Sequence, residues 1–262
     1  MRDAVDFRLF RRFFMISPEG AEHPTWTMPV DDLLRDDAMR EAFRICGQPY
    51  RAIGPFLPAS FIGLSVYGLA AVQLMVLAET GRWIDLTPSN LIFEVTVREG
   101  YADIGYRIRH VRLSDVPAGE ARDAGLRDVW TAFHRNTVIP LVERITGEAG
   151  VKPQLVWNQF PSRHAFLRDY MREHETRPEV LARFEREDAL LGSLPAGLFR
   201  LRKNPYLHEP QYIPSPYEEG KTIMIRSACC MYYRREQGTK CYNCPILSER
   251  DREEMRRSLV NG

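Results

Sequence analysis

Four cysteines lie close together near the C-terminal end of the sequence, and their thiols are its strongest chemical signal. They form an adjacent pair, then ten intervening residues, then a second pair separated by two residues: Cys229, Cys230, Cys241 and Cys244. Thiolates bind zinc or the irons of an iron–sulfur cluster, and four thiols this close in a reduced protein are more typical of a metal site than of disulfides. The fifth, Cys46, ends an amphipathic run and is predicted to be a small buried apolar residue.

The spacing of the four cysteines bears on which metal they bind. Zinc sites usually use two separated knuckles, because the spacer residues let both sulfurs of a knuckle converge on one tetrahedral ion. The adjacent Cys229 and Cys230 fit that arrangement poorly, since neighbouring side chains diverge from an extended backbone. A two-iron cluster distributes its four ligand positions over two metals and accepts such a pair more readily. The spacing therefore favours a 2Fe–2S cluster and leaves a zinc-stabilised interaction module as the alternative.

The Cys-Cys-x10-Cys-x2-Cys pattern, with Arg226 before it and Tyr233 inside it, resembles the C-terminal motif of the FhuF family of ferric siderophore reductases. The resemblance covers about the last forty residues; before them it extends only to length, helical character and the Trp157-Asn158 dipeptide. It implies that each of the four cysteines is a ligand of a 2Fe–2S cluster that reduces siderophore-bound Fe(III). It also implies a fold similar to the C-terminal part of aerobactin-type siderophore synthetases.

The implied reaction is chemically reasonable for such a cluster. Hard oxygen donors hold Fe(III) far more tightly than Fe(II), so one added electron loosens the chelate. The predicted partners are a ferric siderophore of the hydroxamate type and an electron donor such as a ferredoxin or flavin reductase. An external donor is expected because the sequence has no GxGxxG or P-loop motif for a bound nucleotide. The further alternative is an iron–sulfur electron carrier or redox sensor that serves a protein partner.

Five residues outside the cysteine set are predicted substrate contacts. Arg226 and Arg234 lie beside or within the ligand loop, and Lys203 ends a short basic run upstream of it. Their positive charge can attract an anionic chelate or offset the charge of the cluster, although a solvated basic surface is the alternative for each. Trp157 and Asn158 are expected to contribute to the pocket on the strength of the family resemblance, with core packing as the alternative.

Composition and charge limit the other function classes. The chain has 262 residues, of which 44% are hydrophobic and 27% charged, and its formal net charge is +1. The chain therefore lacks the overall positive electrostatic potential that would attract nucleic acid, and no nucleic-acid partner is expected. The start of the sequence has no pattern of a secretion signal, and with the odd number of cysteines this predicts a cytoplasmic protein, expected to be a monomer.

The hydrophobic periodicity predicts an α+β fold: a mostly helical body with a small antiparallel sheet, followed by the cysteine-rich module. The segment 52–78 is uncharged and long enough for a membrane span, but its prolines and glycines favour a buried core helix over 60–78, with peripheral membrane contact as the alternative. Alternation predicts a β-hairpin of 91–97 and 104–108. Helices are expected over 31–46, 126–137 with a bend or end at Pro140, 162–173, 178–191 and from Ser248 onward.

The proline-rich segment 194–220 has no sustained period and is predicted to be a long surface connection, followed by a short strand over 221–227. The predicted division is therefore a body of residues 1–215, which forms the chelate site, and a 2Fe–2S module of residues 216–262.

Overall fold

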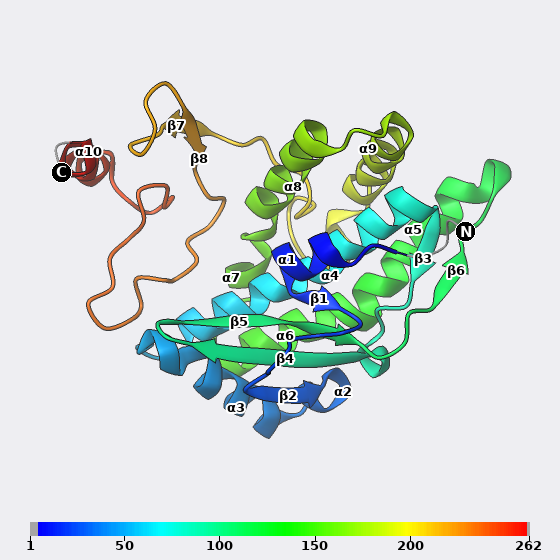
Figure 1. The fold of residues 1–262 in the computed structure, drawn as a ribbon, viewed down its shortest axis with the longest axis horizontal. Coiled ribbons are helices and arrows are strands. Elements are labelled where there is room, and N and C mark those ends of the chain that lie inside the picture. Colours follow the sequence, from blue (N-terminus) through cyan, green and yellow to red (C-terminus); the bar gives the residue numbers. More distant parts are fainter. Residues whose placement is uncertain (1–4, 261–262) are drawn as a thin grey trace.

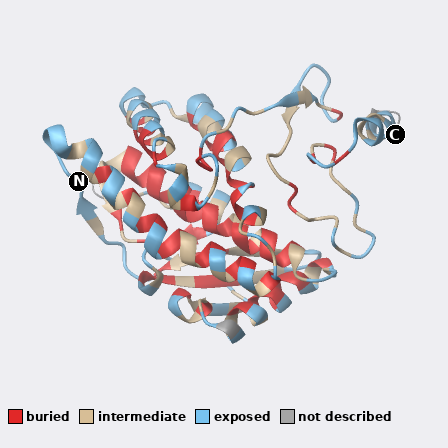
Figure 2. Ribbon diagram, turned by 180° about the vertical axis from the view of Figure 1, so that it is seen from behind, coloured by how far each residue is buried: buried red, intermediate tan, exposed pale blue. Residues whose placement is uncertain are grey.

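The uncharged segment forms one long helix, α4 (Phe56–Thr80), which runs through the middle of the computed structural model (Figure 1). The structure describes residues 5–260. Pro58 is tolerated in the first turn, where backbone N–H groups have no partner within the helix, and Gly81 ends the helix with a φ of 70°. By length and composition α4 qualifies as a membrane span, yet 83% of its most apolar window is buried inside the protein (Figure 2). The core-helix prediction is confirmed.

The predicted β-hairpin is present as β4 (Leu91–Arg98) and β5 (Tyr101–Ile108), which pair antiparallel across a Glu99-Gly100 turn. Two short strands extend it to a four-stranded sheet in the order β1-β5-β4-β2: β1 (Ile16–Ser17) lies parallel to β5, and β2 (Trp26–Pro29) lies antiparallel to β4. The sequence did not predict β1 and β2, because segments of two to four residues are too short to show a period.

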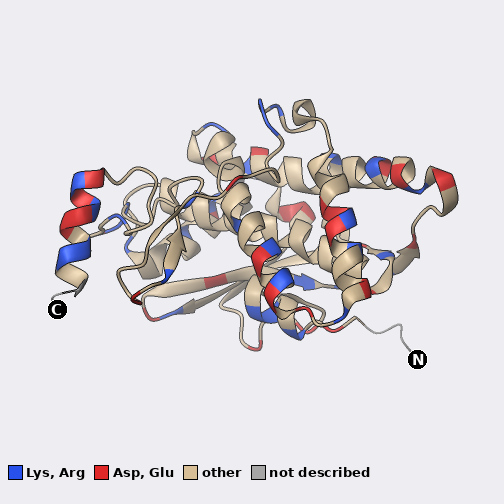
Figure 3. Cartoon of the chain, turned by 90° about the horizontal axis from the view of Figure 1, so that it is seen from above, with Lys and Arg blue, Asp and Glu red and all other residues tan. Residues whose placement is uncertain are grey.

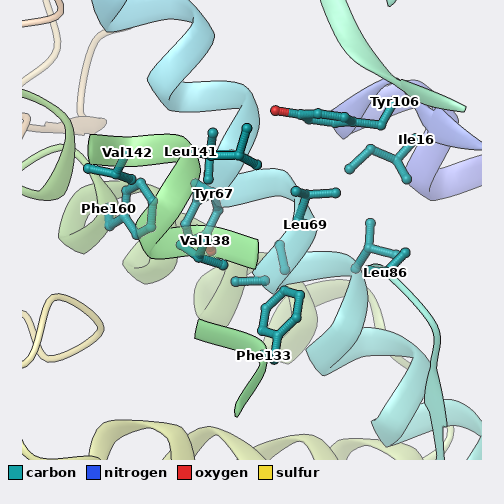
Figure 4. Packing of buried hydrophobic residues seen from close by; sticks show 14 of the residues in the cluster. Ile16, Tyr67, Leu69, Leu86, Tyr106, Phe133, Val138, Leu141, Val142 and Phe160 are labelled. Carbon is teal, nitrogen blue, oxygen red and sulfur yellow. The ribbon is translucent and has the colours of Figure 1, made fainter. Parts of the chain in front are cut away.

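The remaining helices surround α4 on the sides that the sheet leaves open. Their bounds are α1 (Arg8–Phe14), α2 (Val30–Leu33), α3 (Asp36–Gly47), α5 (Arg122–Phe133), α6 (Ile139–Ala149), α7 (Gln154–Trp157), α8 (Phe160–His174) and α9 (Pro178–Gly192). A second small sheet pairs β3 (Arg82–Ile84) with β6 (Leu113–Asp115). Apolar side chains of α4, α5, α6, α8 and the sheet meet in one continuous core, part of which is shown in Figure 4. Cys46 is fully buried in this core, as predicted.

Two predicted helices are interrupted. The helix expected over 31–46 is divided into α2 and α3, because Arg35 has an extended backbone with a ψ of 155° that breaks the hydrogen-bond ladder. The helix expected over 126–137 continues from α5 through a π-helical turn at 134–138 into α6, where Pro140 lies in the first turn. Proline has no N–H to donate to the preceding turn, so the wide π turn adapts the backbone before it. The helix therefore does not end at Pro140, and its regular hydrogen-bond pattern changes in the turn just before this residue.

The segment 194–220 is only partly the surface connection that the sequence predicted. Its first half packs into the body: Leu194, Phe199 and Tyr206 are buried, and the buried Asn204 amide donates to the carbonyls of Leu191, Gly192 and Leu194 at 2.9, 3.1 and 3.0 Å. These contacts use single side chains rather than a repeating face, so they leave no period in the sequence. The second half leaves the body and leads to β7 (Tyr212–Pro214).

The C-terminal part is built from short elements. Strand β7 pairs antiparallel with β8 (Thr222–Met224), a long loop carries the cysteines, and α10 (Glu249–Val260) follows (Figure 1). As predicted, Ser248 begins the last helix, because its hydroxyl accepts a hydrogen bond from the Asp251 N–H at 3.1 Å. Acidic and basic side chains alternate along the exposed α10 (Figure 3). The β7–β8 pairing extends across the predicted boundary at residue 215, and the division into two domains stays a prediction.

Candidate metal centre

The first cysteine pair is held against the body by hydrogen bonds from α4 and from the start of α8. The Ser60 hydroxyl, in the first turns of α4, donates to the Cys230 carbonyl at 2.8 Å. The Ser227 hydroxyl donates to the Asn158 carbonyl at 2.7 Å and accepts from the Ser162 N–H at 3.1 Å. These bonds fix the chain on both sides of Cys229 and Cys230 relative to the body.

The second pair, Cys241 and Cys244, lies in a tight turn in which the Cys244 N–H donates to the Cys241 carbonyl at 3.0 Å. Arg252 of α10 donates to the carbonyls of Tyr242 and, at 3.1 Å, of Cys244. Strand β8 is linked to the same turn, because the Asn243 side-chain amide donates to the Met224 carbonyl at 3.1 Å, and the Arg226 N–H just after the strand donates to the Asn243 carbonyl at 3.1 Å. The turn is therefore positioned by one element that precedes it in the sequence, β8, and by one that follows it, α10.

The loop between the two pairs lies along the chain that precedes α4. The Ile53 N–H donates to the Arg234 carbonyl at 2.9 Å, and the Glu236 N–H donates to the Arg51 carbonyl at 3.1 Å. Gly238 allows the loop to close, because a Cβ atom at this position would lie 2.4 Å from the Tyr233 carbonyl oxygen. The ten-residue spacing thus accommodates a loop that docks on the body before it returns to Cys241.

The four sulfurs line one small cavity. All four cysteines are free thiols; Cys229, Cys230 and Cys244 are buried, and Cys241 is partly exposed. The side chains interact in two pairs, Cys229 with Cys244 and Cys230 with Cys241. Within residues 5–260 no three His, Cys, Asp or Glu side chains are arranged to hold a single ion. Two pairs of sulfurs agree with the demand of a two-iron cluster, in which each iron takes two protein ligands.

Hydrogen-bond donors and charge favour the thiolate form of Cys230 in particular. The Arg226 guanidinium donates to the Cys230 Sγ at 2.9 Å, and the Met231 N–H donates to the Cys229 Sγ at 3.4 Å. The pKa of Cys230 is lowered to about 5 by the contact with Cys241 and by Arg226, against the effect of burial. Burial raises the pKa of Cys229 to about 12, and the Cys230 sulfur raises the pKa of Cys241. Cys230 therefore ionises first, and the donor set fits an iron–sulfur cluster.

A pocket of about 530 Å³ adjoins the cysteines and is lined by residues of both the body and the module. Cys230, Cys241 and Arg226 lie in its wall, opposite residues of α1, α4, β5 and α8. Six aromatic rings line it: Phe13, Phe14, Tyr50, Phe61, Tyr67 and Tyr232. The Tyr232 ring stacks on Phe61 with 6.1 Å between ring centroids, so the module supplies part of the aromatic wall.

The five predicted substrate contacts lie at different places. Arg226 lines the pocket. Arg234 is exposed, with its guanidinium 5.3 Å from the centre of the Phe56 ring, and Lys203 is exposed on the loop after α9. Trp157 packs in the core against Phe160 and Phe199, whereas Asn158 is exposed and accepts the Ser227 hydrogen bond. Among the described residues that line the pocket, these last four do not appear; their role in substrate binding stays a prediction.

The sequence does not identify Arg163, Ser60 or the aromatic residues that the body contributes to the pocket. Arg163 is one of several arginines on an amphipathic helix, and Ser60 and Phe61 belong to an apolar run. The long uncharged segment was recognised as a core helix, but which of its turns faces the cysteines was not visible in its composition.

Comparison with family models decides what the cysteine segment is. Residues 226–245 match the model of the FhuF 2Fe-2S C-terminal domain. This segment is similar to the cluster-binding domain of the FhuF family. The cofactor is accordingly a 2Fe–2S cluster, and the match favours it over the zinc site that the cysteine count alone left open. Cys229, Cys230, Cys241 and Cys244 all lie within the matched residues, and their role as its ligands stays a prediction. No curated protein matches the chain. The FhuF-type match connects the protein with iron–sulfur proteins of siderophore-iron reduction.

Proposed function

We propose that the protein is a ferric siderophore reductase. The observation that carries this proposal is the position of Cys230 and Cys241 in the wall of a pocket that the helical body also lines. Its volume of about 530 Å³ lies in the range of small-molecule sites, and its lining is mainly apolar and aromatic with a few charged groups. A chelate in this pocket lies beside two cluster ligands without having to exchange its own iron ligands for cysteine.

When bound, the 2Fe–2S cluster supplies one electron at a time to the Fe(III) of the chelate, which becomes Fe(II). The electron is replaced by a ferredoxin or a flavin reductase. The residues of the chain hold the chelate: the aromatic rings of α1 and α4 contact its organic shell, and the rings limit the access of water. Fe(II) is held more weakly than Fe(III) by hard oxygen donors, so the iron leaves after reduction.

Arg226 has a second effect in this proposal, on the reduction potential. Its guanidinium donates to the Cys230 Sγ at 2.9 Å, and a charge-assisted hydrogen bond to a ligand sulfur stabilises the more negative, reduced form. Hydrogen bonding and burial of the sulfurs are therefore the means by which this chain sets its potential.

The proposal extends to the location, the oligomeric state, the siderophore type and the fold of the protein. We infer a cytoplasmic monomer, a hydroxamate-containing siderophore, and a body whose fold is similar to the C-terminal part of aerobactin-type siderophore synthetases. They rest on the sequence and on the resemblance to the FhuF family.

The proposal is tested with protein purified without oxygen. A brown protein with about two irons per chain and a rhombic electron paramagnetic resonance signal after one-electron reduction is expected. Reduced protein should convert a ferric siderophore to Fe(II), detected with a ferrous chelator, and Cys241→Ser should lose this activity. The matched control is Cys46→Ala, which removes the cysteine of the body core and should keep colour and activity.

Other outcomes separate the alternatives. Full chelate reduction by Cys241→Ser contradicts the assignment of the cluster to the reaction. A reducible cluster without any chelate reduction leaves an electron carrier or redox sensor. A colourless protein with stoichiometric zinc identifies a structural zinc module.

A further inference from the structure

Arg163 of α8 is a pocket residue without a carboxylate partner. It lies in the lining together with Arg226, and among the side chains that the structure describes it takes part in no ion pair. The carboxylate in the same lining, Asp103, accepts from Arg98 at 2.7 Å and is neutralised by it. Most other arginines of α8 and α9 are paired, as Arg172 is with Glu185 at 3.3 Å. The pocket therefore contains one guanidinium that is not paired with a carboxylate of the described residues.

The two arginines of the pocket have different surroundings. Arg226 is bound to the Cys230 Sγ at 2.9 Å and so faces the cluster. Arg163 is accessible to solvent through the pocket, but the surrounding protein lowers the pKa of its guanidinium, and the nearby Arg226 lowers it further. A guanidinium remains charged under all ordinary conditions, so the pocket contains two neighbouring positive charges. An anion placed between the two arginines relieves their mutual repulsion.

We propose that this pocket selects ferric chelates with a net negative charge and that Arg163 is their charged contact. The inference rests on the proposed function, since it names the class of siderophore that the site takes. It concerns the overall charge of the complex and not the type of iron donor, so a hydroxamate chelate that carries a free carboxylate belongs to the class. The aromatic lining, with Phe61 and Tyr232 stacked, packs against the organic shell of either a neutral or a charged chelate and gives no charge preference.

The test uses gallium(III), which replaces Fe(III) in siderophores and is not reduced, so that binding is measured without electron transfer. One linear trihydroxamate with a terminal amine supplies three matched probes: the free amine gives a cationic complex, the acetylated amine a neutral one and the succinylated amine an anionic one. Binding to the cluster-loaded protein is measured by titration calorimetry. The anionic complex should bind at least about tenfold more tightly than the cationic one, and the preference should weaken as salt is added.

Arg163→Gln should lower the affinity of the protein for the anionic gallium complex by about tenfold. Its affinity for the cationic complex should stay the same or increase. Arg172→Gln is the matched control, because Arg172 lies on the same helix, is exposed and pairs with Glu185 outside the pocket. The control should keep the wild-type preference. The midpoint potential of each variant is recorded as well, since a guanidinium that acts only as a counter-charge of the cluster would shift the potential and not the preference.

The outcomes of the two proposals are distinguishable. A charge preference that depends on Arg163, found in a protein that reduces no ferric chelate, supports this inference and overturns the reductase assignment. Chelate reduction together with equal affinities for the three probes, or a preference that Arg163→Gln leaves intact, overturns the inference alone. If none of the gallium complexes binds, both are wrong.

Discussion

Around α4, apolar side chains from the sheet and from most helices form one continuous buried cluster, whereas Cys229, Cys244 and Leu247 are the buried residues of the separate cluster in the C-terminal module. The module instead relies on hydrogen bonds to backbone carbonyls, such as those from Arg252 and Ser60. Burial of apolar surface stabilises the body without a cofactor. The module buries too little for that, so we infer that its conformation depends on the cluster.

The largest expected effect follows from removing a ligand. Cys244→Ser should abolish the visible absorption and lower chelate reduction by more than about a hundredfold, because metal binding stabilises the fold of a small metal domain. The body should remain folded, and its free energy of unfolding, measured in urea, should change by less than about 1 kcal/mol. Tryptophan fluorescence reports on the body alone, because all four tryptophans lie between Trp26 and Trp157. Unfolding of the body in this variant would show that the two regions are one cooperative unit.

The second-largest effect is expected from a substitution that creates a cavity in the core of the body. Phe184 of α9 is 1% exposed, and Phe184→Ala should lower the free energy of unfolding of the body by about 3–5 kcal/mol. Iron bound per folded molecule should not change, since the residue is far in the fold from the cysteine loop. The control, Phe166→Ala on α8, removes a ring that is 56% exposed and should change stability by less than about 0.5 kcal/mol. A loss of iron from folded Phe184→Ala would contradict the separation of the two regions.

The body should also lose stability in mild acid through His134. Its imidazole is fully buried, with one ring nitrogen 2.7 Å from the Trp130 carbonyl and the other 2.8 Å from the Tyr206 hydroxyl. Burial lowers the pKa of His134 to about 4, whereas an unfolded histidine has a pKa of about 6.5. Between these pH values the histidine is protonated in the unfolded chain and neutral in the folded protein. Its contribution to the free energy of unfolding is therefore complete above about pH 6.5 and is lost as the pH falls to 4.

We expect this histidine to contribute about 3 kcal/mol of the difference in unfolding free energy between pH 7 and pH 4. Urea titrations followed by tryptophan fluorescence measure that difference. His134→Gln should lower the free energy of unfolding at pH 7. It should also remove the part of the pH dependence that comes from proton uptake by this one histidine. An unchanged pH dependence in this variant would assign the acid sensitivity to other groups.

The smallest effect is expected at the contact between arginine and sulfur. Arg226→Gln removes a charged donor from the Cys230 Sγ and should lower the midpoint potential by on the order of 50 mV, close to a tenfold change in a one-electron equilibrium. The stability of the body should not change. Arg234→Gln is the comparison, since that guanidinium lies over the Phe56 ring, and its effect on the potential should be smaller. Equal shifts in both variants would mean that overall charge, not the hydrogen bond, sets the potential.

The sequence by itself determined the elements that repeat a pattern and the ligands that a motif identifies. The hairpin of β4 and β5, the uncharged core helix and the cysteines of the cluster site belong to this group, because each has a local signal: alternation, absence of charge or spacing. Alternation and helical periods come from the backbone geometry of the element itself, so they can be recognised without knowledge of its neighbours.

Only the tertiary structure decided what these elements face. In the sequence Arg163 does not differ from Arg168 or Arg172 on the same helix, and Phe61 is one apolar residue among many. The pocket arises because the cysteine loop docks on the start of α4 and brings Cys230 and Cys241 opposite side chains that lie far from them in the chain. Such a contact depends on the packing of separate elements, and local periodicity contains no information about it.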